Sequence, residues 1–155
     1  MLAAVVTVGA ATGLAQTKAF DYHAGAELQA KQKEMIAKAV ASGAGNVRIA
    51  EYGDHQVTTA ARTQSGGPEV HEHWADVILV TEGRATMVIG GTVVKPTPRA
   101  EAGPGEMGGT DIDGGTTQVL EKGDLINIPA GTPHWIKIAP GERFAYLNVK
   151  VRRQE

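Results

Sequence analysis

The sequence contains no cysteine in its 155 residues and carries no surplus of positive charge. Without cysteine, disulfides, thiolate metal sites and cysteine nucleophiles are all excluded, so histidine and carboxylate side chains are the available metal ligands. Fifteen lysines and arginines stand against seventeen aspartates and glutamates, giving a formal net charge of −2. A surface of this charge does not favour the phosphates of a nucleic acid, and we expect no nucleic-acid partner.

A hydrophobic run long enough to cross a bilayer is also missing. Residues 1–16 are apolar and uncharged, but this segment is too short to form a stable membrane span. The small residues Gly13 and Ala15 are typical of a signal-peptide cleavage region, whereas the usual basic start is absent. Two interpretations stay open: a signal peptide ending at Ala15, which predicts a periplasmic or secreted protein, or an apolar segment packed at the domain edge of a cytoplasmic one.

The length predicts a single domain with one hydrophobic core. Hydrophobic residues make up 42% and charged residues 21%, which is close to the average of globular proteins. The 20 glycines and 7 prolines fall mostly after residue 64, in short clusters between apolar runs. We therefore expect an apolar N-terminal segment at 1–16, a helical region at 17–45 and a turn-rich β domain at 46–155.

One helix is predicted at Ala24–Ala41, where strong helix formers predominate. Leu28, Met35, Ile36 and Val40 lie near one face, so this helix is expected to cover a sheet. Ser42–Gly45 would end it, because glycine tolerates the left-handed backbone of a helix C-terminus.

From Asn46 onward the apolar period changes from about 3.6 to 2, which predicts short strands. No later helix returns to build a parallel sheet, so the arrangement should be an antiparallel sandwich or barrel. The longest interruption, Lys95–Thr116, is predicted to be a surface excursion or a lid over a pocket. The expected strands are Val47–Tyr52, His55–Thr63, Val70–His73, Asp76–Glu82, Ala85–Ile89, Thr92–Val94, Thr117–Leu120, Leu125–Ile128, His134–Ile138 and Phe144–Val151.

Two short motifs contain the candidate metal-binding histidines of the sequence. The first is His71-Glu72-His73, because residues two apart on a strand share a face and lie roughly 7 Å apart, close enough to bind one metal ion. The second is the stretch from Gly123 to His134, where Pro129, Gly131 and Pro133 specify a tight hairpin before the histidine. Such a rigid turn can hold an imidazole at a preorganised metal site.

These two stretches resemble the two signature motifs of the cupin superfamily, over roughly Asn46–Val151. The second motif matches at its Gly, Pro and His positions, and the first matches at the paired histidines and at Gly83. Counting back from Gly83 reaches Asp76 where the family usually has glutamate, and Ile138 replaces the final asparagine of the second motif. The resemblance implies an all-β fold, an antiparallel double-stranded β-helix or jelly-roll barrel, with a metal site.

The metal ligands that the resemblance implies are His71, His73, Asp76 and His134. Asp76 could instead orient an imidazole from outside the coordination sphere. Nitrogen and oxygen ligands without sulfur suit one divalent ion, Mn, Fe, Ni or Zn. No side chain is identified as a dedicated proton shuttle, so the catalytic residues stay unassigned.

The predicted substrate pocket has a mainly apolar wall. Its residues are Ile78, Met87, Ile89, Ile136, Phe144 and Tyr146, with Ile138 as a further apolar candidate and with Tyr146 and Asn148 as candidates for polar contacts. The strand after His55 adds either Thr59, Ala61 and Thr63 or Gln56, Arg62 and Gln64, depending on its register.

The sequence and the resemblance leave two functions open. The first is a mononuclear metalloenzyme that acts on a small organic substrate, with dioxygenase, isomerase or lyase chemistry. The second is a non-catalytic barrel that binds a ligand or a metal, because one fold serves many functions. Small size, an apolar barrel exterior, the apolar N-terminal segment and the resemblance together predict a homodimer.

Overall fold

The computed structural model describes residues 20–154, so the predicted signal-like segment at 1–16 lies outside the described residues. The described chain begins with helix α1 (Gly25–Ser42) and continues almost entirely as strands. The strands are β1 (Ala44–Glu51), β2 (His55–Arg62), β3 (Glu69–His71), β4 (Trp74–Ile89), β5 (Thr92–Val94), β6 (Thr97–Pro98), β7 (Glu106–Gly108), β8 (Asp111–Asp113), β9 (Thr116–Glu121), β10 (Leu125–Ile128), β11 (His134–Lys137) and β12 (Phe144–Arg152). No helix among the described residues is long and apolar enough to cross a membrane.

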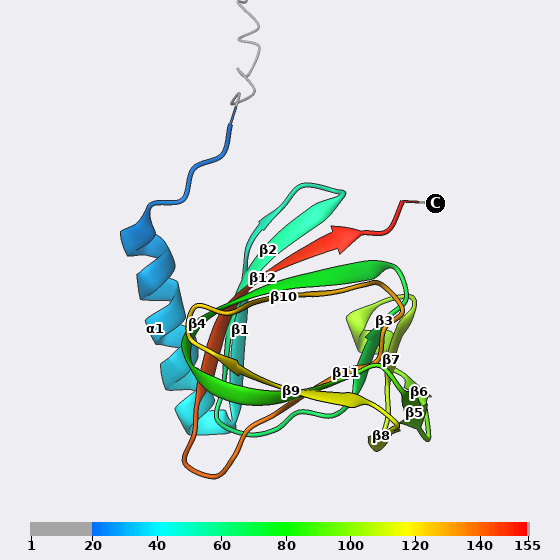
Figure 1. Cartoon of the computed structure of the whole chain (residues 1–155). Helices are drawn as coiled ribbons and strands as arrows, with labels where there is room; N and C mark the ends of the chain where they lie inside the picture. The colour runs from blue at the N-terminus through cyan, green and yellow to red at the C-terminus, as the bar shows by residue number, and fades with distance from the viewer. Residues whose placement is uncertain (1–19, 155) are drawn as a thin grey trace, which may run out of the picture.

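The strands form a curled antiparallel sheet that wraps around an interior, as Figure 1 shows. The first half of β4 pairs with β12 and β10, and its second half pairs with β11 and β9. One side of the curl therefore runs β1-β2-β12-β4-β10 and the other runs β9-β4-β11-β3-β7-β6. The predicted all-β antiparallel barrel with one helix is confirmed.

Strand β4 bends between the two sides at Gly83. The sequence predicts two strands here, Asp76–Glu82 and Ala85–Ile89, but the structure has one continuous strand of 16 residues. Gly83 has φ +75°, and a Cβ atom at this position would lie 1.9 Å from the backbone oxygen of Arg143. Only glycine fits this bend without displacing the neighbouring chain.

Helix α1 lies outside the curl against β1 and β2 (Figure 1). Its buried residues Met35 and Ala39 pack with Ala61 and Ala145 of the sheet. The helix ends at Gly43, which has φ +90° and donates its N–H to the carbonyl of Ala39. The predicted helix bounds are correct to one residue, although Val40, expected on the buried face, is 68% exposed.

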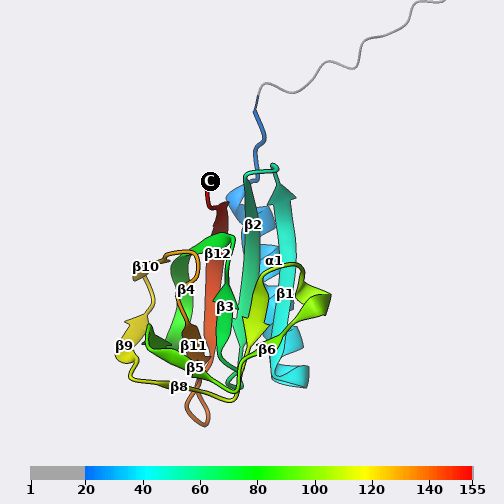
Figure 2. The ribbon, with the colours of Figure 1, turned by 90° about the vertical axis from the view of Figure 1, so that its right-hand side faces the viewer.

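The excursion at 95–116 is ordered into short elements along the sheet edge (Figure 2). Strand β7 pairs with β3, so that Glu106 lies opposite His71, and β8 pairs with β5 in a separate two-stranded sheet. A turn of 3-10 helix at Ala100–Ala102 joins β6 to β7. The excursion therefore extends the barrel wall beside β3.

Candidate metal centre

A cavity of about 570 Å³ opens inside the curl and is lined by both sides of the barrel and by the excursion. Strands β1, β2 and β12 supply most of its polar wall, whereas β3 and β11 supply two histidines. The lining residues are Asn46, Arg48, Gln56, Thr58, Ala60, Arg62, Glu69, His71, Trp74, Asp76, Ile78, Arg99, Ala102, Glu106, His134, Ile136, Tyr146, Asn148 and Lys150.

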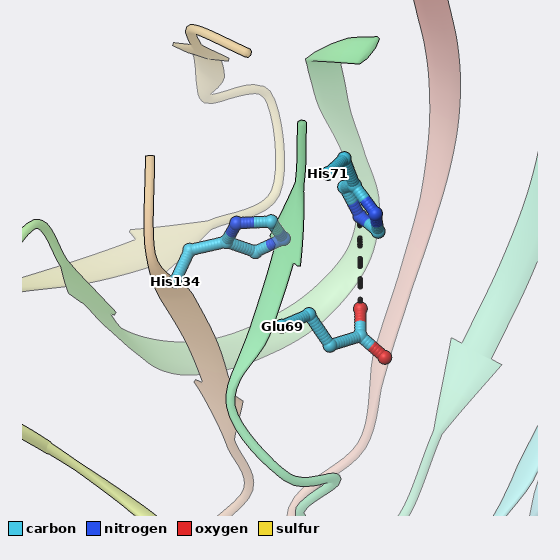
Figure 3. A group of neighbouring side chains, drawn as sticks. All are labelled: Glu69, His71 and His134. Atoms are coloured by element: carbon cyan, nitrogen blue, oxygen red, sulfur yellow. Dashed lines mark ion pairs between the residues drawn. The ribbon is translucent and has the colours of Figure 1, made fainter. Parts of the chain in front are cut away.

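Two buried imidazoles and a carboxylate that line this cavity lie close together, as Figure 3 shows. His71 ends β3 and His134 begins β11, and their ring centroids are 5.1 Å apart. The pairing of β3 with β11 sets Glu69 opposite His134. One ligand atom from each of Glu69, His71 and His134 lies within 4.8 Å of the other two, which is close enough to bind a single ion.

Each imidazole is held through its Nδ1 atom. His71 Nδ1 contacts the carboxylate of Glu106, and His134 Nδ1 lies 3.1 Å from the backbone oxygen of Thr132. Both partners only accept hydrogen bonds, so Nδ1 carries the proton in both rings. The Nε2 atoms are thereby turned toward the carboxylate of Asp76, whose Oδ2 lies 3.2 Å from Nε2 of His71 and 3.5 Å from Nε2 of His134.

The carboxylates of Asp76 and Glu69 are each anchored through one oxygen atom. Asp76 Oδ1 accepts a hydrogen bond of 3.0 Å from Asn148 and lies 3.6 Å from the ammonium of Lys150. The other oxygen, Oδ2, faces the imidazoles. The chain thus fixes this carboxylate while leaving one oxygen available as a ligand.

Glu69 follows the same pattern. Its Oε1 accepts a hydrogen bond of 2.5 Å from Nη1 of Arg99 and lies 4.0 Å from Nη2 of Arg62. Its Oε2 lies 3.9 Å from Nε2 of His71. Burial raises the pKa of the Glu69 carboxyl, but the two guanidinium groups outweigh it and the pKa is lowered. Glu69 is therefore ionised and oriented toward the histidines.

The electrostatics of the remaining groups suit a cation. Burial raises the pKa of Asp76, but the hydrogen bond to His71 and the charge of Lys150 outweigh this effect and lower it to about 2. Burial lowers the pKa of His134, which leaves a neutral ring. Burial also acts to lower the pKa of His71, but contact with Asp76 outweighs it and the pKa is raised.

A carboxylate oxygen and an imidazole lone pair are both acceptors, so they repel unless a cation lies between them. A proton on His71 can fill this role, and so can a divalent metal ion. Glu69, His71 and His134 each place one ligand atom within 4.8 Å of the others, and Oδ2 of Asp76 lies near both Nε2 atoms. These nitrogen and anionic oxygen donors fit such an ion.

The structure brings together three of the four ligands expected from sequence: His71, Asp76 and His134. It does not bring His73 to them. Strand β3 ends at His71, so the expected shared strand face is absent, and the side chain of His73 is 48% exposed on the turn before β4. Its ring packs against Gly105 of the excursion instead.

The predicted pocket wall divides into two groups. Ile78, Ile136 and Tyr146 line the cavity, as expected. Met87 and Phe144 are fully buried in the hydrophobic core, and Ile89 and Ile138 pack against that core. The apolar expectation for these four positions is correct, but they pack between the sheet sides and do not line the cavity.

The open question of the β2 register is also answered. Gln56 and Arg62 line the cavity, but Gln64 of the same alternative lies beyond the end of β2 and is not among the lining residues. Of the other alternative, Ala61 packs beneath helix α1. Asn148, expected to make a polar contact, donates to Asp76.

Two site residues were missed from sequence. Glu69 lies two positions before His71 on the same strand, so the alternation rule that paired His71 with His73 could have found it. Glu106 lies in the excursion 35 residues after His71, and no sequence pattern indicates that these two residues meet.

No family model matches the chain, and no curated protein matches it either. Among solved structures, the polyketide cyclase RemF from Streptomyces resistomycificus matches with a TM-score of 0.50 and 21% identity, covering 73% of this chain and 69% of that one. The cupin-2 domain protein Rru_A2000 from Rhodospirillum rubrum matches with a TM-score of 0.50 and 12% identity, covering 73% of this chain and 62% of that one. The cupin domain of Cnp3 from Schizosaccharomyces pombe matches with a TM-score of 0.53 and 10% identity, covering 72% of this chain and 66% of that one. At these identities the similarity concerns the fold.

Proposed function

The chain has the cupin fold, and we propose on that basis that its cavity holds one divalent metal ion and acts on a small organic molecule. The observation that carries this proposal is the convergence of Nε2 of His71, Nε2 of His134 and Oδ2 of Asp76. Each of these three side chains is fixed through its other polar atom, as expected of a preorganised metal site.

The ion would be held by His71, His134, Asp76 and Glu69. This donor set contains no sulfur and suits Mn, Fe, Ni or Zn. A bound ion of this kind supplies Lewis-acid chemistry toward a substrate oxygen.

The protein's own residues prepare the site for chemistry on a small molecule. Glu106 and the carbonyl of Thr132 orient the imidazoles, while Ile78 and Ile136 contribute apolar surface to the cavity. The cavity volume lies within the range of small-molecule sites, roughly 300–1,000 Å³. Dioxygenase, isomerase and lyase reactions are the classes proposed, and one solved structure with this fold is a cyclase by its description.

The experiment is elemental analysis of protein purified without a metal-affinity column, with the His71→Ala, His134→Ala double variant alongside. We expect near-stoichiometric metal in the wild type and none in the double variant. The matched control is His73→Ala, which removes the exposed histidine and should keep the metal. No metal in the wild type, even after reconstitution, would overturn the proposal and favour the non-catalytic binding barrel.

We also propose a homodimer and a cleaved N-terminus. Leu125 is 67% exposed and pairs with Leu79, itself 39% exposed, so the outer face of the barrel offers apolar surface to a second copy. Light scattering of the purified protein tests the dimer, and N-terminal sequencing of the secreted or periplasmic fraction tests cleavage after Ala15.

A further inference from the structure

The cavity wall that faces the histidines across the barrel is polar along two neighbouring rows of the sheet. In the first row, Arg48 of β1 pairs with Thr58 of β2, and Thr58 pairs with Asn148 of β12. In the second row, Gln56 pairs with Lys150, and Lys150 pairs with Asp76. All six residues line the cavity. A wall of this kind is suited to a ligand with several polar groups.

The charge of the cavity favours an anion. Four cationic side chains and three carboxylates line it, so the lining is net positive before any metal is added. The anchored carboxylates of Asp76 and Glu69 are directed to the proposed ion, which adds two further positive charges. Lys150, whose side chain is only 20% exposed, lies 3.6 Å from Oδ1 of Asp76, the carboxylate that faces the histidines.

Asn148 adds a requirement for a hydrogen-bond donor. Its Nδ2 is used by Asp76, and its Oδ1 is buried with no hydrogen-bond partner among the described residues. A buried acceptor without a donor is costly and rare in native proteins. A ligand hydroxyl in the cavity would supply the missing donor, and the hydroxyl of Thr58 on the adjacent strand can accept or donate beside it.

We infer that the substrate of this cavity is a small hydroxylated carboxylic acid. Its carboxylate binds between the metal site and Lys150, and its hydroxyl groups bind Asn148 and Thr58. Arg48 lies two strands away from Asn148 at the exposed rim and is paired with Glu51, so the inference assigns the anion contact to Lys150. This inference rests on the proposed function, because it takes the cavity as the substrate site.

The test is calorimetric binding to the full chain, both metal-loaded and after chelator treatment. The ligands are three hydroxy acids (glycerate, malate and gluconate), their deoxy counterparts (propionate, succinate and hexanoate), and two polyols (glycerol and glucitol). We expect at least one hydroxy acid to bind about tenfold or more tightly than its deoxy counterpart, because the deoxy acid leaves the acceptor of Asn148 unpaired. The polyols should bind weakly, because they lack the charge.

Two conservative variants assign the contacts. Lys150→Met keeps the length of the side chain and should weaken hydroxy-acid binding about tenfold or more, through the loss of a charge-assisted hydrogen bond. Its control is Lys137→Met, since Lys137 stacks on Trp135 and does not line the cavity. Thr58→Val keeps the shape of the residue and should reduce the preference for hydroxy over deoxy acids, with Thr117→Val on β9 as its control.

Several outcomes would overturn the inference: no hydroxy acid binds, a deoxy acid or a polyol binds as tightly, or Lys150→Met binds like the wild type. The metal content of every sample is measured in parallel. Wild-type protein that holds no metal even after reconstitution, but still prefers hydroxy acids, refutes the proposed metal site and supports the substrate class. Normal metal content without selectivity refutes the substrate class alone.

Discussion

Replacing Glu106 by glutamine tests whether the excursion controls the metal centre. Glu106 is 8% exposed and contacts Nδ1 of His71, which is 6% exposed. Glutamine keeps the shape of the side chain but removes the negative charge that makes Nε2 of His71 a stronger donor to a metal. Loss of such an outer partner costs about 10- to 100-fold in metal affinity, or about 1.4–2.7 kcal/mol. We expect the upper half of this range, because solvent screens a buried pair poorly.

The assay is a competition titration against a chromophoric chelator, with circular dichroism to verify that the variant is folded. Glu101→Gln is the control, because Glu101 lies in the same excursion but its side chain is 75% exposed and forms an ion pair with Arg99. The control should retain wild-type affinity. Equal affinities for Glu106→Gln and the wild type would refute the argument that the excursion tunes the centre, and so would an equal loss in the control.

Three further predictions follow from the same geometry. Asp76→Asn should lose metal on dialysis while Glu72→Gln retains it, because Asp76 faces both imidazoles and Glu72 is an exposed turn residue; equal metal contents by elemental analysis would remove Asp76 from the ligand set. Met87→Ala should lower the free energy of unfolding by about 2–5 kcal/mol, against a loss of less than about 0.5 kcal/mol for Val40→Ala on the exposed face of helix α1, as measured by urea denaturation. In metal-free protein, the pKa of Asp76 is lowered to about 2, so this carboxylate stabilises the fold above about pH 4 and the stabilisation is lost toward pH 2. The pKa of His71 is raised, so this histidine stabilises the fold below its ordinary pKa of 6.5, and the stabilisation is lost as pH rises through the folded value. Because the lowered pKa of His134 acts in the opposite direction to the raised pKa of His71, the test is on the acid side: stability should fall below about pH 4, and an equal fall in Asp76→Asn would contradict this account.

The sequence predicts the elements that obey local rules. The helix ends where Gly43 permits a left-handed backbone, and β10 begins and ends at the residues expected from alternation. The bend at Gly83 was misinterpreted as a break between two strands, because a glycine turn and a glycine bend give the same local signal. Strands β6, β7 and β8 were missed because they are two or three residues long and lie in the glycine- and proline-rich excursion, whose composition indicates a loop. Strand β5 is equally short, but its β-branched residues Thr92–Val94 indicate a strand.

The site was also predicted only in part, because local spacing indicates some of its residues and long-range strand pairing decides the others. His134 follows a turn that proline and glycine specify, and His71 lies at the end of a strand, so both could be placed from local spacing. His73 was assigned by assuming that β3 continues two residues further. The contact between Glu106 and His71 depends on the pairing of β7 with β3, a long-range register that a single sequence does not encode in any local pattern.

The excursion at 95–116 has a consequence for engineering. It supplies Arg99, Ala102 and Glu106 to the cavity, yet it joins the barrel through short pairings at the sheet edge and a two-stranded sheet of its own. The hydrophobic core around Met87 draws almost nothing from it. This segment can therefore be replaced as a unit, which would change the contact with His71 and the lining of the cavity while the packing of the barrel core is kept.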